Sequence, residues 1–243
     1  MAALLFRDDA TLRHCEATVV AVHGEGTEAA PWQVELDRTV FYPLGGGQPG
    51  DRGTLRAADG TEWHVTEARK GAGAEDVLHR LAPGAPAPAV GAQVAAAIDW
   101  DHRHRLMRLH TALHLLSAVV RAPVTGGRIA ADKAHLDFDI EMEQLNREAI
   151  EAGVNALVEA AHPTRAVWIT DAELEARPDL VKTMSVAPPR GEGRVRLLEI
   201  PGVDLQACGG THVANTAEIG RLAVLRIRSE GRRNRRVTLG FAA

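Results

Sequence analysis

Cysteine is scarce in this chain, since only Cys15 and Cys208 occur among its 243 residues. Two cysteines do not make the disulfide framework that stabilises many small secreted domains. Long hydrophobic runs are also lacking, and no apolar stretch approaches the roughly 20 residues that cross a membrane as a helix. The first apolar stretch is followed at once by Asp8 and Asp9, which argues against a signal peptide. We therefore expect a cytoplasmic protein with free thiols and no membrane contact.

An excess of positive charge is lacking as well. The chain has 28 Lys and Arg against 32 Asp and Glu, and the formal net charge of -4 argues against a general nucleic-acid coat protein. Arginines nevertheless crowd the C-terminal end, at Arg226, Arg228, Arg232, Arg233, Arg235 and Arg236. A local basic patch on an acidic protein predicts selective contact with a polyanion.

The first part of the chain has the pattern of short strands. Residues 15–38, CEATVVAVHGEGTEAAPWQVELDR, contain two β-branched runs around a Gly-containing loop, which predicts a hairpin. Strand-like pieces follow at RTVFYP, GTLRA and EWHVTEA, separated by turn residues. We therefore predict a small β-barrel domain over residues 1–92. Its boundary is expected in Ala82–Ala92, APGAPAPAVGA, because so much Pro, Ala and Gly interrupts regular structure.

The second part, residues 93–243, is predicted to mix helices and strands. After a short strand at QVAAAI, Asp99 or Asp101 is expected to cap a long, half-buried helix. Its apolar residues recur at helical spacing at Leu106, Leu109, Leu113, Leu116 and Val120. A second helix is predicted over residues 141–163, with its inward face at Leu145, Ile150, Val154 and Leu157. A strand, a Gly-rich turn, a short helix and a closing hairpin follow, so the fold class is α+β.

Four side chains have the spacing of a metal site. His110 and His114 are one helical turn apart, so both imidazoles point to one side of the predicted helix. Cys208 and His212 are separated by three residues, two of which are glycines, in CGGTH. Either pair alone is a weak signal, and buried structural residues are the alternative. Together they supply nitrogen and sulfur donors that favour zinc, and the single sulfur favours a catalytic ion over a cysteine-rich structural one. Whether three or all four residues bind the metal stays open.

The residues around the first pair indicate which reaction such an ion would assist. The helix reads H-T-A-L-H and lacks the glutamate that serves as the base in H-E-x-x-H metalloproteases. Peptide hydrolysis is therefore not predicted. An ester is cleaved more easily than an amide, and zinc lowers the pKa of bound water to about 7 without a strong protein base. The chemistry points to a labile ester.

A glycine-rich loop stands upstream, in DRTVFYPLGGGQPGDRG at Asp37–Gly53. Gly45, Gly46 and Gly47 would let a ligand approach the backbone closely, and Gln48 offers both a hydrogen-bond donor and an acceptor. By itself the triplet is only a turn signal. The loop also lacks the Lys-Ser or Lys-Thr that completes a phosphate-binding P-loop.

Together these segments resemble a known family. TVFYPLGGGQPGDRG, RLMRLHTALHLL and CGGTHVANTAEIG are similar, in the same order and over nearly the whole chain, to segments of the AlaX alanyl-tRNA editing proteins. These are free-standing relatives of the editing domain of alanyl-tRNA synthetase, and the length resembles the mid-length subgroup. The resemblance implies a zinc-dependent deacylase that removes serine, and also glycine, from mischarged tRNA(Ala).

The resemblance also implies roles for particular residues. His110, His114, Cys208 and His212 correspond to the zinc site, and Gly45, Gly46, Gly47 and Gln48 to the glycine-rich motif that faces it. Thr39 corresponds to a threonine that recognises the seryl hydroxyl. On this basis Thr39→Val is expected to erode the preference for serine over alanine more than it lowers stability. Arg232, Arg233, Arg235 and Arg236 are expected to hold tRNA phosphates, the alternative being a solvated loop.

Other interpretations remain open from the sequence. The chain could be a non-catalytic tRNA-binding module in which zinc only fastens the helix to the CGGTH turn. A synthetase fragment is disfavoured because no segment resembles an ATP-binding core. The charged residues that precede the metal pair on the same helix are expected mainly at the surface: His102, Arg103, His104, Arg105 and Arg108.

Overall fold

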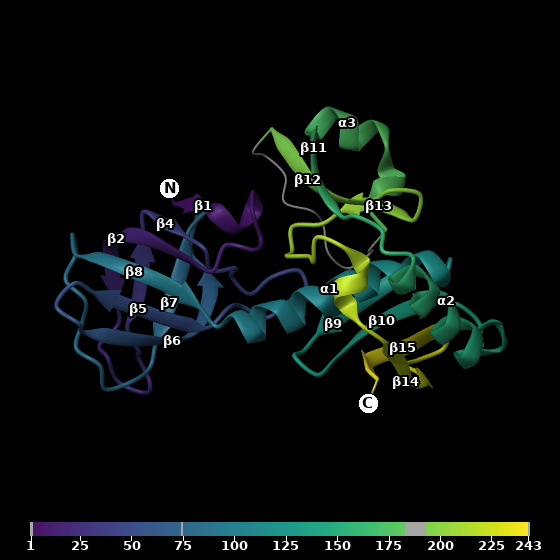
Figure 1. The fold of residues 1–243 in the computed structure, drawn as a ribbon, viewed down its shortest axis with the longest axis horizontal. Helices are drawn as coiled ribbons and strands as arrows, with labels where there is room; N and C mark the ends of the chain where they lie inside the picture. Colours follow the sequence, from purple (N-terminus) through teal and green to yellow (C-terminus); the bar gives the residue numbers. More distant parts are fainter. Residues whose placement is uncertain (1, 74, 183–192, 243) are drawn as a thin grey trace. The chain divides into compact units, whose positions relative to one another are not determined.

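The computed structural model describes residues 2–73, 75–182 and 193–242. The chain forms two compact units, Met1–His104 and Arg105–Ala243 (Figure 1). The first is an all-β unit and the second combines helices with two sheets, so the predicted α+β class with an N-terminal barrel is confirmed. No helix among the described residues is long and apolar enough to cross a membrane.

A closed six-stranded barrel makes up most of the first unit, with strand order β2-β3-β7-β6-β5-β8. The strands and the short 3₁₀ helix of this unit are β1 (Ala3–Leu4), η1 (Leu5–Arg7), β2 (His14–His23), β3 (Gln33–Leu36), β4 (Arg38–Thr39), β5 (Gly53–Ala57), β6 (Glu62–Lys70), β7 (Val77–Leu81) and β8 (Gln93–Ile98). Strands β2 and β3 are antiparallel neighbours, as predicted from residues 15–38. The two-residue β4 pairs in parallel with β1 and stands outside the barrel.

The first unit extends past the boundary expected at Ala92. Strand β8 pairs with both β2 and β5 and thereby closes the barrel. The Pro-rich segment before it is fastened to the barrel by two indoles: Trp32 donates to the Ala85 carbonyl at 3.1 Å and Trp63 to the Pro86 carbonyl at 2.8 Å. Because its carbonyls are bound in this way and Ala85 and Ala92 pack against the barrel core, the segment is attached to the barrel.

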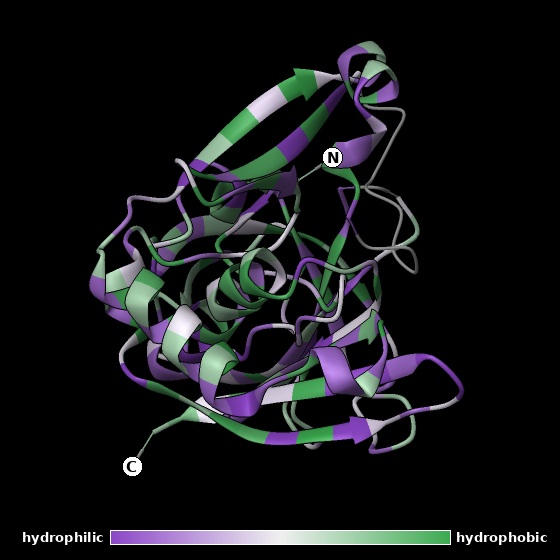
Figure 2. Ribbon diagram, turned by 90° about the vertical axis from the view of Figure 1, so that its right-hand side faces the viewer, coloured by the Kyte–Doolittle hydropathy of each residue, from purple (hydrophilic) through white to green (hydrophobic). Residues whose placement is uncertain are grey.

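Alternating burial builds the barrel core. In β7 the pattern is buried, intermediate, buried, intermediate, buried, as expected where one face of a strand is covered. Figure 2 shows hydrophobic and hydrophilic residues alternating along strands in the same way. The largest members of the core are Leu36, Phe41, Leu55, Trp63 and Leu81.

Helix α1 (Trp100–Val119) begins at the cap predicted for it. The carboxylate of Asp99 accepts the backbone N–H of His102 at 3.1 Å, which satisfies one of the free donors of the first turn. All five leucine and valine positions predicted to face inward are buried. The helix is buried nearly all round from Leu106 to Ser117, however, and not along one face only.

The expectation that Arg103 lies at the surface is wrong. Arg103 and Asp51 are both fully buried in the first unit, and the guanidinium makes a two-pronged ion pair with the carboxylate. Arg103 also donates to the carbonyls of Val40 and Ala10, at 2.6 and 2.9 Å. Asp51 in turn accepts the backbone N–H of Tyr42 at 2.6 Å. The pair therefore holds both ends of the segment that carries the glycine triplet.

Two antiparallel sheets and two further helices make up the second unit, with orders β14-β15-β10-β9 and β11-β12-β13. Its elements after α1 are β9 (Val124–Ile129), β10 (Lys133–Asp139), η2 (Met142–Gln144), α2 (Arg147–Glu159), β11 (Arg165–Thr170), α3 (Asp171–Ala176), η3 (Pro178–Leu180), β12 (Arg194–Ile200), β13 (Asp204–Ala207), η4 (Thr216–Ile219), β14 (Leu222–Ser229) and β15 (Asn234–Phe241). The predicted closing hairpin is β14–β15.

Helix α2 is shorter than the prediction over residues 141–163. Its N-cap is Asn146, whose side chain accepts the N–H of Ala149, so the helix begins after this residue. Ile150 and Val154 face the core as predicted, and Val158 is buried in place of Leu157.

Candidate metal centre

Four side chains predicted to bind a metal converge in the second unit. His110 and His114 project from α1, and Cys208 and His212 lie in the turn that follows β13. Their ligand-type atoms all lie within 4.8 Å of one another, and the three histidines are buried. Cys208 Sγ lies 3.5 Å from His110 Nε2 and 3.2 Å from His212 Nε2. The sequence therefore predicted this constellation from residues almost 100 positions apart.

Arg196 on strand β12 supports the turn that carries Cys208. Its guanidinium donates to the carbonyls of Cys208 and Gly210, at 3.0 and 2.9 Å, and the Cys208 N–H returns a bond to the Arg196 carbonyl at 3.1 Å. At the far side of the turn, Val213 donates its N–H to Thr111 Oγ1 on α1 at 3.3 Å. The turn is thus bound at one end to a sheet and at the other to the helix that carries the first histidine pair.

In two of the histidines, the Nδ1 atom, which points away from the cluster, has a hydrogen-bond partner outside it. His114 Nδ1 lies 2.8 Å from Asp204 Oδ2, and His212 Nδ1 lies 3.2 Å from Thr111 Oγ1. Thr111 donates its hydroxyl proton to the Met107 carbonyl at 2.9 Å, so it can only accept from His212. Both rings therefore carry hydrogen on Nδ1 and turn Nε2 toward the cluster.

Burial and neighbouring charges set the protonation of the cluster. Burial by itself would raise the pKa of Cys208, but the imidazoles of His110 and His212 bring it well below the usual value. Burial, followed by the charge of His110, lowers the pKa of His212. For His114, burial would lower the pKa, but hydrogen bonds and charges of Asp204 and Cys208 raise it to about 9.

The thiolate of Cys208 and the neutral ring of His212 match the donor set of a metal site, and His114 joins that set once a metal displaces its second proton. A thiolate sulfur and imidazole nitrogens are the ligands that zinc and similar borderline-soft ions take. The ligand-type atoms already lie close together, so a metal ion could take their lone pairs without an element of the second unit being moved. The four residues therefore fit a divalent transition metal.

The glycine-rich segment lies in the first unit and forms a tight turn. Gly45 and Gln48 exchange two backbone hydrogen bonds, at 3.1 and 3.0 Å, and the Tyr42 hydroxyl donates to the Gly45 carbonyl at 2.9 Å. Gly46 and Gly47 have φ values of 58° and 82°, a region that side chains disfavour, so glycine is needed at both. Gln48 is fully buried within this turn.

Thr39, also in the first unit, has its hydroxyl committed to buried partners. His79 Nδ1 donates to the Val34 carbonyl at 2.9 Å, which leaves His79 Nε2 as the acceptor of the Thr39 hydroxyl proton at 2.8 Å. The same Thr39 oxygen accepts the Phe41 N–H at 3.0 Å. Thr39 is fully buried, so a contact with substrate would require this arrangement to open.

The arginines of the β14–β15 hairpin fall into two groups. Arg235 is buried and donates to the carbonyls of Gly231 and Arg232, while Arg236 makes a two-pronged ion pair with Asp137 at 2.7 and 2.8 Å. Arg232 is exposed, as is Arg233, which pairs with Asp139 at 3.0 Å. The first group supports the hairpin, and the second is exposed at its tip, where Arg233 is held in a surface ion pair.

The polar groups behind the metal cluster could not be recognised in the sequence. Asp204, Gln206 and Thr111 are buried, and Lys182 pairs with Asp204. No spacing motif marks them, because each acts through one histidine. The only sequence signal is that Asp204 and Gln206 precede Cys208 at alternating positions of one short strand.

Two family models match the chain. Residues 11–102 match the class II (A) tRNA synthetases, and residues 195–238, which contain Cys208 and His212, match the threonyl and alanyl tRNA synthetase second additional domain. The fold and the site thus define a protein related to aminoacyl-tRNA synthetases.

Full-length relatives narrow this class to one family. The chain is 36% identical to the alanyl-tRNA editing protein AlaX-M of Methanosarcina mazei, over 98% of this chain and 95% of that protein. It is 35% identical to AlaX-M of Saccharolobus solfataricus over 96% of each. The alanine–tRNA ligase of Halorubrum lacusprofundi is 36% identical over 91% of this chain but only 24% of its own length. The chain belongs to the AlaX-M family of alanyl-tRNA editing proteins.

Proposed function

We propose that this protein is a zinc-dependent deacylase that hydrolyses the ester bond of seryl-tRNA(Ala), and also of glycyl-tRNA(Ala). The observation that carries the proposal is the buried cluster of His110, His114, Cys208 and His212 in a chain of the AlaX-M family. The relatives are named alanyl-tRNA editing proteins, which supports tRNA(Ala) as the substrate. The residues of the cluster support the type of reaction.

The chain's own residues define what the reaction can use. A thiolate at Cys208 and inward nitrogens on three imidazoles would hold the ion. When bound, zinc supplies Lewis acidity, which an ester needs only in modest degree because it is more labile than an amide. The turn of α1 between His110 and His114 contains no carboxylate, so this turn of the helix offers no glutamate to act as a protease base. This supports ester over peptide cleavage.

The choice of serine and glycine follows from the limits of binding pockets. A pocket built for alanine discriminates by only about 1 to 3 kcal/mol against glycine or against serine with its added hydroxyl. A second hydrolytic site is then needed to remove the errors. Such a site can spare alanyl-tRNA by providing a polar group that pairs only with the hydroxyl of serine. We propose that Thr39 supports the barrel and that the group which meets the seryl hydroxyl is another one.

For tRNA binding we propose the exposed arginines of the four-stranded sheet. Arg226 pairs in register with Thr238, Thr238 with His135, and His135 with Arg128, so one cross-strand row has an exposed arginine at each end. Arg232 adds a third exposed arginine at the hairpin tip. Such side chains give salt-dependent affinity for phosphates that is largely independent of base sequence.

The test is release of serine from seryl-tRNA(Ala), with alanyl-tRNA(Ala) as the control substrate. Wild type should release serine selectively. Cys208→Ala should reduce the rate by at least about 100-fold, which corresponds to roughly 2.7 kcal/mol of lost transition-state stabilisation. Cys15→Ala is the matched control, because it removes the other free thiol from the first unit. It should leave the rate unchanged.

The same experiment separates the proposal from a non-catalytic module. Four buried donors that lie so close together also fit a closed structural site. If wild type binds tRNA but releases no serine above the uncatalysed rate, and chelation unfolds the second unit, the ion has a structural role and the deacylase proposal is refuted.

A further inference from the structure

We propose that Asp204 is a positioning residue, which fixes His114 in the Nδ1–H tautomer and so presents its Nε2 to the metal. This inference rests on the proposed metal-binding role of the cluster. It extends that role from the four ligand residues to a carboxylate that contacts only one of them.

The geometry around Asp204 leaves one consistent hydrogen arrangement. Asp204 Oδ2 lies 2.8 Å from His114 Nδ1, and Gln206 Nε2 lies 2.7 Å from that oxygen and 2.7 Å from the same ring nitrogen. The other oxygen, Oδ1, is paired with Lys182. The carboxylate can only accept, and Gln206 Nε2 can donate to it, so a lone pair on His114 Nδ1 would face the lone pairs of Oδ2, whereas a hydrogen on Nδ1 is accepted by them. The Asp204 side chain has no exposed surface, and water is therefore not available to replace these bonds.

Asp204 also differs in charge from the group behind the second histidine. Thr111 accepts from His212 as a neutral hydroxyl at 3.2 Å, whereas Asp204 accepts from His114 as an anion at 2.8 Å. Metal-binding histidines commonly donate their outer N–H to a carboxylate, which orients the ring and makes the inner nitrogen a stronger donor. His114 is therefore expected to be more strongly oriented than His212.

Lys182 makes this arrangement sensitive to substitution of the carboxylate. The ammonium of Lys182 offers only donors, as does the His114 Nδ1–H. In Asp204→Asn the carbonyl oxygen can face one of them, but the amide N–H₂ must then face the other. The isosteric variant Asp204→Asn thus loses the negative charge, and its amide N–H₂ faces either the Lys182 ammonium or the His114 Nδ1–H, neither of which can accept a hydrogen bond.

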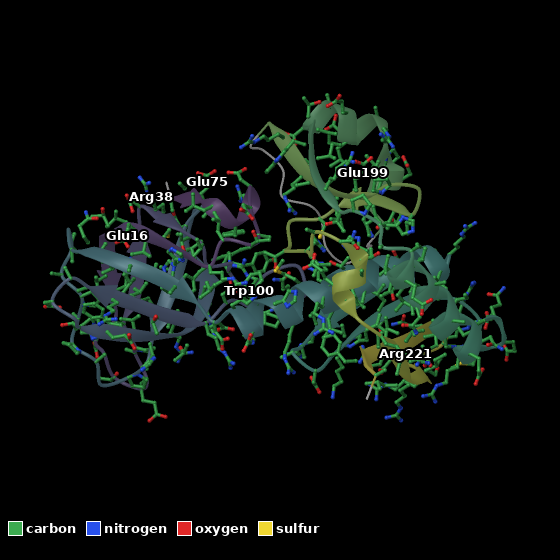
Figure 3. The ribbon with its side chains drawn as sticks, viewed as in Figure 1. Glu16, Arg38, Glu75, Trp100, Glu199 and Arg221 are labelled. Atoms are coloured by element: carbon green, nitrogen blue, oxygen red, sulfur yellow. The ribbon has the colours of Figure 1, made fainter. Side chains whose placement is uncertain are left out.

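The expected result is a weaker metal site with a changed tautomer. Loss of such an outer carboxylate typically lowers metal affinity by about 10–100-fold. We expect the zinc dissociation constant of Asp204→Asn, measured by chelator competition on the full chain, to rise within this range. Glu199→Gln is the matched control, since it removes a carboxylate on neighbouring strand β12 of the same sheet without touching the cluster (Figure 3).

A spectroscopic readout separates positioning from a general loss of structure. Long-range proton–nitrogen spectra of the metal-free protein, recorded at a pH well above the His114 pKa of about 9 so that the ring is neutral, report which ring nitrogen carries hydrogen, and His114→Gln identifies the signal. Wild type and Glu199→Gln should show His114 as the Nδ1–H form. In Asp204→Asn the signal should move to the other tautomer or to a mixture. Co²⁺ substituted for zinc should also give an altered visible spectrum in this variant alone.

The outcomes distinguish this inference from the proposed function. If wild type binds zinc and Asp204→Asn keeps both its affinity, within about threefold, and the His114 tautomer, the positioning role is refuted whatever the enzyme's activity. If wild type binds no zinc and releases no serine, the proposed function fails first. A tautomer change in the folded metal-free variant supports the inference independently of catalysis.

Discussion

Replacing Thr39 with valine distinguishes a structural hydroxyl from one that contacts substrate. Valine keeps the shape but leaves two buried groups without partners, His79 Nε2 and the Phe41 N–H, which now contact the hydroxyl at 2.8 and 3.0 Å. Each unsatisfied buried group costs about 1–3 kcal/mol, so Thr39→Val should lose about 2–4 kcal/mol once relaxation is allowed. That is a large fraction of the roughly 5–15 kcal/mol that stabilises a folded domain.

Urea unfolding followed by tryptophan fluorescence measures this loss, because Trp63 is buried in the same barrel core. Thr39→Ser keeps the hydroxyl and should recover most of the stability. The ratio of serine to alanine release should stay at the wild-type value in both variants. Full stability together with lost discrimination would refute our reasoning and return Thr39 to the role implied by the family resemblance.

Two further predictions concern acid stability and tRNA binding. Burial lowers the pKa of His79 to about 4 from 6.5, so only the unfolded state takes up a proton between these values, and about 3 kcal/mol of stability should be lost as pH falls through this window. Urea titrations at pH 7.5 and 4.5 should show this loss in wild type and a smaller one in His79→Gln. Reversing Arg128, Arg226 and Arg232 to glutamate should weaken tRNA binding and flatten its salt dependence by about 0.9 per lost phosphate contact. Reversing Arg221, at the other end of β14 (Figure 3), should do neither, and an equal effect would argue for non-specific attraction.

Local patterns determined how much of the fold could be predicted. The barrel strands and α1 carry strong periodicity, and Asp99 caps the helix as its sequence position indicates. Proline and glycine in Ala82–Ala92 predict an irregular backbone, but they do not show whether the segment is attached to the strands that precede it. Two indole bonds from Trp32 and Trp63 attach this segment to the barrel, and neither can be inferred from local sequence.

Arg103 was predicted at the surface because it is charged, but it is buried. An isolated buried guanidinium would be prohibitively costly, so helical spacing with many basic neighbours predicts exposure. Asp51 lies 52 residues earlier, and its carboxylate offsets that cost only because the glycine-rich segment brings it under the helix start. A compensating partner so distant in sequence leaves no periodic signal at either position.

The metal cluster was predictable and the groups behind it were not, for a common physical reason. A metal requires its ligands to converge within a few ångströms, and this favours short spacings such as His110 to His114 and Cys208 to His212. The second layer needs only one acceptor per ring, and a carboxylate or a hydroxyl from any element can supply it. Asp204 and Thr111 meet that need from a strand and a helix. The metal-binding residues can therefore be found from their spacing in the sequence. The groups that hydrogen-bond to them are constrained only by their position in space, so they can be found only in the structure.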